Sequence, residues 1–173
     1  MNDVGNDLLE VVTPDGDIIG SALRKDVHGN NKLLHRVVHV FVFNNRGELL
    51  LQQRSLNKDV APGKWDTSVG GHVDFGESIE VAMQREMEEE LGIASDKNVP
   101  VFLYKYIHSN DYESELVYSY SFTHDGQIVF NKDEIESVKY YPIREIEEKL
   151  GTGLFSDNFE HEFHNYLRLV GFS

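Results

Sequence analysis

The sequence contains no cysteine, is short of basic residues relative to acidic ones, and has no long apolar run. Without cysteine the chain forms no disulfide, thiolate zinc site or cysteine nucleophile. Its 16 Lys and Arg against 30 Asp and Glu give a net charge of −14, which disfavours nucleic acid polymers and anionic membranes as partners. No segment approaches the ~18 apolar residues of a membrane-spanning helix. Residues 1–10 lack the basic and apolar regions of a signal peptide, so we expect a cytoplasmic protein.

The length of 173 residues fits a single domain, since about 150 residues is a reasonable prior for one. We expect one domain over 1–173, made of an N-terminal hairpin and loop extension (1–34), a core (35–150) and a C-terminal helix (151–173). The hairpin and the C-terminal helix are surfaces through which two copies could pair as a homodimer.

The hydrophobic pattern predicts more strands than helices. Val37–Phe43 is apolar on both faces apart from His39, which indicates a central covered strand, and the turn at 44–47 leads to a partner strand. We expect strands at 8–13, 18–20, 37–43, 48–53, 65–69, 99–107, 113–123, 128–130 and 139–141, a loop at 55–63, and helices at 78–91, 143–150 and 157–170, the last capped by Asp157. Such a pattern is typical of an α/β (α+β) fold with a mixed β-sheet sandwiched between α-helices.

The helix at 78–91 carries acidic residues on its apolar side. A step of 100° per residue puts Ile79, Met83, Met87 and Leu91 on one stripe, with Glu90 about 20° and Glu86 about 60° from Met83. Carboxylates on a buried face are costly unless a partner compensates them, and Mg²⁺ is one such partner.

A solvated acidic helix is the alternative interpretation of this segment. It accounts for Glu80 and Glu88, because glutamate is a good helix former on exposed faces. It does not account for Glu86 and Glu90, which it leaves on the core side.

The segment from Gly71 to Ile93 resembles the Nudix box, G-x5-E-x7-R-E-U-x-E-E-x-G-U, where U is aliphatic. Every constrained place is filled, by Gly71, Glu77, Arg85, Glu86, Met87, Glu89, Glu90, Gly92 and Ile93. The resemblance implies a Nudix fold and hydrolysis of a diphosphate linked to another moiety X, with Mg²⁺ or Mn²⁺ as cofactor. A divalent cation can neutralise diphosphate oxygens and lower the pKa of bound water, which agrees with that chemistry.

The resemblance also implies roles for single residues. Glu86, Glu89 and Glu90 would be metal ligands, and Gly70 would offer its carbonyl oxygen. Arg85 would orient these carboxylates, and Glu77 would brace the joint between loop and helix.

A second set of residues resembles type 1 isopentenyl diphosphate isomerase, a member of the same superfamily. The shared pieces are Arg24, His28, His35, Arg54, Lys58, Pro62-Gly63-x-Trp65, His72 and Glu113-x-Glu115. The resemblance implies a second divalent metal at His28, His35, His72, Glu113 and Glu115, and binding of diphosphate by Arg24, Arg54 and Lys58. Glu113 and Glu115 point the same way from a strand, and three histidines with two carboxylates suit Mn²⁺, Mg²⁺ or Zn²⁺.

The sequence departs from the isomerase pattern at Gly70, where the isomerase has an acid/base cysteine. It also keeps the complete Nudix box, which isomerases usually lack. Both features favour diphosphate hydrolysis, with a box carboxylate or Glu115 as general base. Isomerisation and a non-catalytic ligand-binding domain remain the alternatives.

The remaining histidines and aromatic residues have less specific interpretations. His39 is expected to be a hydrogen-bonded core histidine, and His108, His124, His161 and His164 ordinary surface or helix residues. Trp65, Tyr104 and Tyr118 are candidate walls for the X group, although core packing is the commoner use of such side chains. The sequence does not identify X.

Overall fold

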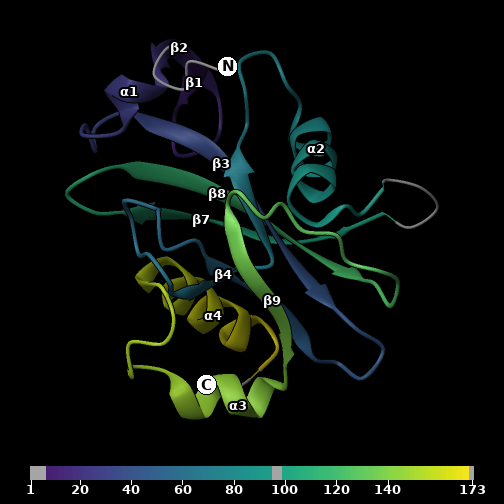
Figure 1. Cartoon of the computed structure of the whole chain (residues 1–173). Helices are drawn as coiled ribbons and strands as arrows, with labels where there is room; N and C mark the ends of the chain where they lie inside the picture. The colour runs from purple at the N-terminus through teal and green to yellow at the C-terminus, as the bar shows by residue number, and fades with distance from the viewer. Residues whose placement is uncertain (1–6, 95–98, 172–173) are drawn as a thin grey trace.

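The computed structural model describes residues 7–94 and 99–171. These residues form four helices and nine strands, in the order β1, β2, α1, β3 to β6, α2, β7 to β9, α3 and α4. Figure 1 shows their arrangement. The strands are β1 (Leu8–Val12), β2 (Ile18–Leu23), β3 (Leu34–Phe43), β4 (Leu49–Arg54), β5 (Trp65–Asp66), β6 (Val69–His72), β7 (Val101–Ser109), β8 (Ser114–Thr123) and β9 (Ile135–Tyr141). The helices are α1 (Arg24–Val27), α2 (Ile79–Leu91), α3 (Ile143–Lys149) and α4 (Asp157–Leu169). Within the described ranges no helix is long and apolar enough to span a membrane.

The strand β3 organises a mixed sheet. It runs parallel to β8 over its whole length and antiparallel to β6, while β4 pairs with β9 and β7 with β8. Its residues 37–42 are buried on both faces, as expected for a covered central strand.

The two faces of β3 belong to two apolar clusters. Val38, Val40 and Val42 face α2, which contributes Met83, Met87 and Leu91 among other residues. On the other face, Phe41 packs with Leu49 and Leu51 and with aromatic residues of α4. Figure 1 shows α2 on one side of the sheet and α3 and α4 on the other, so the predicted mixed sheet between helices is confirmed.

The predicted strand at 128–130 is wrong. This segment instead crosses the end of α2, where Val129 N–H donates to Leu91 O at 3.1 Å and Asn131 N–H donates to Glu90 O at 3.1 Å. The free carbonyl groups of a helix C-terminus satisfy its backbone, so the segment needs no neighbouring strand.

Other elements differ in detail. The expected strand at 65–69 is two strands, because β5 pairs with β4 and β6 pairs with β3. The turn at 44–47 does connect β3 to β4, but these strands pair only at Phe43 and Leu49. Ser156, not Asp157, caps α4, since its side chain accepts from Phe159 N–H. The short helix α1 was not predicted.

Candidate metal and diphosphate site

The register of β3 brings several predicted site residues to one face of the sheet. His35 lies opposite Glu115 in the parallel pair with β8, and Val37 lies opposite His72 in the antiparallel pair with β6. Alternate residues of a strand share a face, so His35, His72, Glu113 and Glu115 project to the same side.

A compact group forms there from His28, His35, His72 and Glu113. Each of the four offers one ligand atom within 4.8 Å of the others. His28 Nε2 lies 3.3 Å from Glu113 Oε2, and His35 Nε2 lies 3.8 Å from the same oxygen. Three of the converging atoms, His35 Nε2, His72 Nε2 and Glu113 Oε2, are buried without a hydrogen-bond partner. Buried polar atoms without partners are rare, so this group fits a divalent cation.

The electrostatics of the group favour metal binding. Burial, followed by neighbouring positive groups, lowers the pKa of His72 well below its usual value. Burial is also the largest cause that lowers the pKa of His35, to about 4. Neutral imidazoles keep the lone pair that a metal needs.

Glu115, the fifth predicted ligand, lies beside this group and outside it. Its Oε2 atom is 4.0 Å from His35 Nε2. Burial, and next the charge of Glu113, raises its pKa to about 8. The structure therefore brings four of the five predicted ligands together and leaves Glu115 at their edge.

The helix α2 presents the box carboxylates at different depths. Ser78 caps its start by accepting from Val81 N–H at 3.2 Å, and Gly92 ends it in the left-handed region at φ 64°. Glu90 is buried, Glu86 has a side chain 14% exposed, and Glu89 has one 57% exposed. The helical period predicts this order.

Glu90 is held by groups outside the helix. Its Oε1 accepts from Gln52 Nε2 at 2.9 Å, and its Oε2 accepts from Gly70 N–H at 3.2 Å. Burial, followed by the charge of Glu86, nevertheless raises the pKa of Glu90 well above its usual value. Two crowded carboxylates of this kind fit a cation that would neutralise them.

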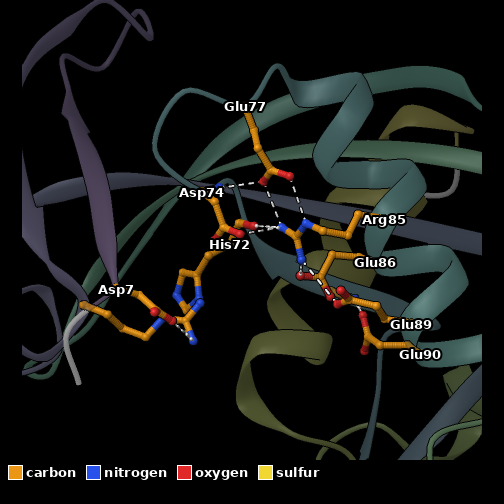
Figure 2. Close-up of polar contacts among 10 residues, drawn as sticks. Asp7, His72, Asp74, Glu77, Arg85, Glu86, Glu89 and Glu90 are labelled. Atoms are coloured by element: carbon orange, nitrogen blue, oxygen red, sulfur yellow. Dashed lines mark hydrogen bonds and ion pairs between the residues drawn. The ribbon is translucent and has the colours of Figure 1, made fainter. Parts of the chain in front are cut away.

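Arg85 lies at the centre of the acidic residues of the box (Figure 2). It donates to both carboxylate oxygens of Glu77 at 2.8 Å, to Glu86 Oε1 at 2.7 Å and to Glu89 Oε2 at 3.3 Å. It also donates to His72 O at 3.1 Å, and Glu77 accepts from Asp74 N–H at 2.8 Å. These contacts tie α2 to the loop before it and to the His72 strand.

One pocket of about 460 Å³ is lined by residues from both groups. From the histidine side its lining includes His28, His72, Glu113 and Glu115, and from the box side Glu90, Gly70 and Gly71. The predicted ligands Glu86, Glu89 and His35 do not line it. The predicted substrate residues Arg54 and Lys58 also line it. Arg24 does not line it and pairs with Asp7 at 3.6 Å. A cavity of about 800 Å³ beside Gly92 and Val99 is lined by none of the residues predicted to bind metal or substrate.

Several lining residues were missed or interpreted otherwise from the sequence. Gln52 was missed, although a polar residue directly after the buried run Leu49–Leu51 is a usable signal. His39 is buried and hydrogen-bonded as expected, with its Nδ1 3.3 Å from Glu162 Oε1, but it also lines the pocket. Trp65 and Tyr118 pack against the two cores, as their commoner use suggests.

The other histidines lie away from the pocket lining. His124 is half-buried, with its ring stacked on Phe122 and its Nε2 3.3 Å from Gln127 O. His164 is an exposed residue of α4. His108 and His161 are half-buried and contact each other, with their Nδ1 atoms 2.7 Å apart.

Comparison with known proteins agrees with the two resemblances. A family model described as the NUDIX domain matches residues 33–162. An isopentenyl-diphosphate delta-isomerase of Photorhabdus laumondii is 36% identical over 139 residues, which are 78% of this chain and 77% of that protein. An uncharacterised Nudix hydrolase of Nostoc sp. is 35% identical over 144 residues, 82% of this chain and 84% of that protein. The crystal structure of DR0079 from Deinococcus radiodurans has a TM-score of 0.79 at 25% identity, over 91% of this chain and 98% of that one.

Proposed function

Because the chain belongs to the Nudix family, we propose that it is a hydrolase that cleaves a diphosphate linkage in a small molecule with the help of Mg²⁺ or Mn²⁺. One observation carries the proposal: Glu90, buried and held by Gln52 and Gly70, lines the same pocket as Arg54 and Lys58. Carboxylates for a cation and basic groups for an anion thus share one cavity, as phosphoryl chemistry requires.

We assign metal binding to the carboxylates of the box and their positioning to Arg85. Glu86, Glu89 and Glu90 would hold the cation, with the Gly70 carbonyl oxygen as a further ligand. A divalent cation at this place supplies positive charge that neutralises diphosphate oxygens and makes water a better nucleophile. Arg85 keeps the carboxylates in place, since it contacts Glu77, Glu86 and Glu89 together.

Three basic residues are assigned to the diphosphate. Arg54 and Lys58 line the pocket, paired with Asp66 at 3.5 Å and with Glu134 at 3.9 Å. Their half-exposed ion pairs are weak enough to exchange for phosphate oxygens. Arg24 would have to turn away from Asp7 to join them. The general base remains a choice between a box carboxylate and Glu115, which lines the pocket.

Isomerisation of isopentenyl diphosphate is the second candidate. It is favoured by the group of His28, His35, His72 and Glu113, and by relatives that are named as that isomerase. Gly70 weighs against it, because the position offers no thiol to move a proton on carbon. A non-catalytic ligand-binding domain is weaker still, since the box carboxylates are all present.

A substrate panel tests the proposal. Purified protein is incubated with Mg²⁺ and nucleotide sugars, dinucleoside polyphosphates, NADH or isoprenoid diphosphates, and phosphate-containing products are measured. We expect cleavage of at least one compound and no cleavage by the Glu89→Gln, Glu90→Gln double variant. The double variant Glu80→Gln, Glu88→Gln is the matched control, because both residues are exposed on the same helix.

The same panel separates the two activities. Deuterium incorporated from heavy water into an isoprenoid diphosphate, without release of phosphate, would favour the isomerase. Failure of the wild-type protein to cleave any compound would count against hydrolysis.

A further inference from the structure

The first strand of the chain lies against the loop that precedes α2, although this strand belongs to the N-terminal hairpin and not to the box. Leu9 of β1 pairs with Asp74 in an isolated antiparallel bridge. Phe75 N–H donates to Leu8 O at 3.2 Å. The hairpin is therefore attached by its backbone to the segment that leads into the box helix.

Glu10 adds a side-chain contact to this attachment. Its side chain is 6% exposed, and its Oε1 accepts from Gly76 N–H at 2.7 Å. Gly76 has a φ of 80°, in the left-handed region that favours glycine. On the side of β3, Arg36 Nη2 lies 3.5 Å from the same oxygen. A buried carboxylate held between a backbone amide and an arginine has little freedom to move.

The loop is tied in turn to the arginine of the box (Figure 2). Glu77 Oε1 accepts both from Asp74 N–H and from Arg85 Nη2, each at 2.8 Å. Asp74 Oδ2 also lies 3.3 Å from Arg85 Nη2. Arg85 then donates to Glu86 Oε1 at 2.7 Å. A continuous series of contacts therefore runs from Glu10 through this loop to a candidate metal ligand.

We propose that Glu10 is a positioning residue for the cation site of α2, which keeps Arg85 and Glu86 in the arrangement that binds the metal by holding Gly76. The proposal rests on the proposed function, since that function places a cation at Glu86. Glu10 does not line the pocket, so it acts through the loop and not by touching the substrate. Loss of a residue that supports metal ligands without touching the metal typically costs about 10–100-fold in metal affinity.

Two substitutions separate the hydrogen-bond acceptor from the rest of the side chain. Glu10→Met keeps the length of the side chain but offers no oxygen to Gly76 N–H, and an amide that loses its partner draws the loop toward another one. Glu10→Gln keeps Oε1 and lacks only the charge, so a smaller effect in the same direction is expected. Asp17→Met is the matched control, because Asp17 is an exposed carboxylate of the same hairpin.

The first readout needs no metal. ¹H–¹⁵N spectra report the Nε–H of Arg85, which donates to Glu77 Oε2 at 2.8 Å, and its signal is assigned by comparison with Arg85→Lys. We expect Glu10→Met to shift this signal together with the amide signal of Gly76, and Asp17→Met to shift neither. A carboxylate with only a local structural role would change the Gly76 signal and leave that of Arg85 in place.

The second readout is the affinity for Mn²⁺, measured by calorimetric titration. All variants are made in the His35→Gln, His72→Gln background, so that the α2 carboxylates bind the ion without the histidine group. We expect Glu10→Met to bind Mn²⁺ at least about tenfold more weakly than this background, and Glu10→Gln to lose less. Asp17→Met should bind as the background does.

The outcomes are distinguishable. If the background protein binds Mn²⁺, and a folded Glu10→Met variant binds it equally well or leaves the Arg85 signal unchanged, the proposal for Glu10 is wrong and the proposed function stands. If the background protein binds no Mn²⁺ and wild-type protein cleaves none of the substrate panel, the proposed function fails and the role of Glu10 fails with it. Should Glu10→Met not fold, Glu10→Gln decides by the same two readouts.

Discussion

Glu86 and Gly71 lie so close together that the identity of residue 71 decides where the Glu86 carboxylate can lie. A Cβ atom added to Gly71 would collide with the carboxylate of Glu86. Glu86 in turn accepts from Arg85 Nη1 at 2.7 Å, so it has little freedom to move away. Glycine at position 71 therefore keeps open the space in which a candidate metal ligand lies.

Replacing Gly71 tests whether this space is needed for metal binding by Glu86. Gly71→Ala is expected to lower the affinity for Mn²⁺ at least about tenfold, because displaced ligands and their supports cost metal affinity of that order. Isothermal titration with Mn²⁺ measures the change. Gly20→Ala is the control, since a Cβ atom there meets nothing within 4 Å. Equal Mn²⁺ affinity in Gly71→Ala and wild type would contradict the assignment of Glu86.

The helix α4 is attached to the sheet by both apolar and polar contacts. Phe159 and Phe163 are fully buried in the second core, and Glu162 lies between them in sequence with its side chain also buried. A carboxylate in that place is stabilising only while its partners His39, Ser119 and Tyr104 are satisfied. The attachment of α4 should therefore depend on the ionisation of Glu162.

This dependence has a definite sign. The pKa of Glu162 is lower in the folded protein than its ordinary value, so its carboxylate contributes stability above about pH 4.3, its usual unfolded value. That contribution is lost as the pH falls through the folded pKa. We expect Glu162→Gln to lower the free energy of unfolding by about 2 kcal/mol at pH 7, and by less at pH 4. Urea unfolding at both pH values measures it, with exposed Glu147→Gln as the control. An equal loss at both pH values would exclude the ionised carboxylate as the cause.

Some elements were predictable because their signals are local. The apolar stripe and the caps of α2 lie within one stretch of sequence, and so does the inward direction of Glu86 and Glu90. The segment 128–130 is as apolar as a buried strand, but the backbone of Val129 donates to the end of α2. No local sequence pattern indicates this distant partner. The split of 65–69 into β5 and β6 likewise depends on which strands lie beside them.

In the site, too, local signals were predictable from the sequence and long-range contacts were not. The box carboxylates are three or four residues apart, so the helical period alone brings them together. The contact of His39 with Glu162 joins residues 123 positions apart, and nothing in the local sequence indicates it. The histidine group was predicted through resemblance to a family. Its members come from separate segments, and residue types alone could not establish that they meet.

At the scale of the whole molecule, the pocket uses all three expected parts of the chain. His28 comes from 1–34, the box from 35–150, and Asn158 from 151–173. We therefore propose that residues 1–173 form one domain, and we expect one cooperative transition in calorimetry. Pairing of two copies stays a prediction, to be checked by sedimentation; β2, with exposed Ile18 and Ile19, is a surface on which to test it.

Metal binding should stabilise the whole fold. At a Mn²⁺ concentration of about 100 times the dissociation constant, the expected gain is about 2.7 kcal/mol, which corresponds to a rise in Tm of roughly 5–10 °C. The His35→Gln, His72→Gln double variant should lose part of this rise, because two ligands of the histidine group are gone. His124→Gln, His164→Gln is the matched control. No rise in wild type would argue that the folded protein binds no Mn²⁺.

The central claim is that divalent cations bind at the α2 carboxylates and at the histidine group. Anomalous scattering from a crystal soaked in Mn²⁺ tests it most directly. We predict one anomalous peak beside Glu86 and Glu90, and a second among His28, His35, His72 and Glu113. A map that shows neither peak, with those side chains pointing into solvent, would contradict it.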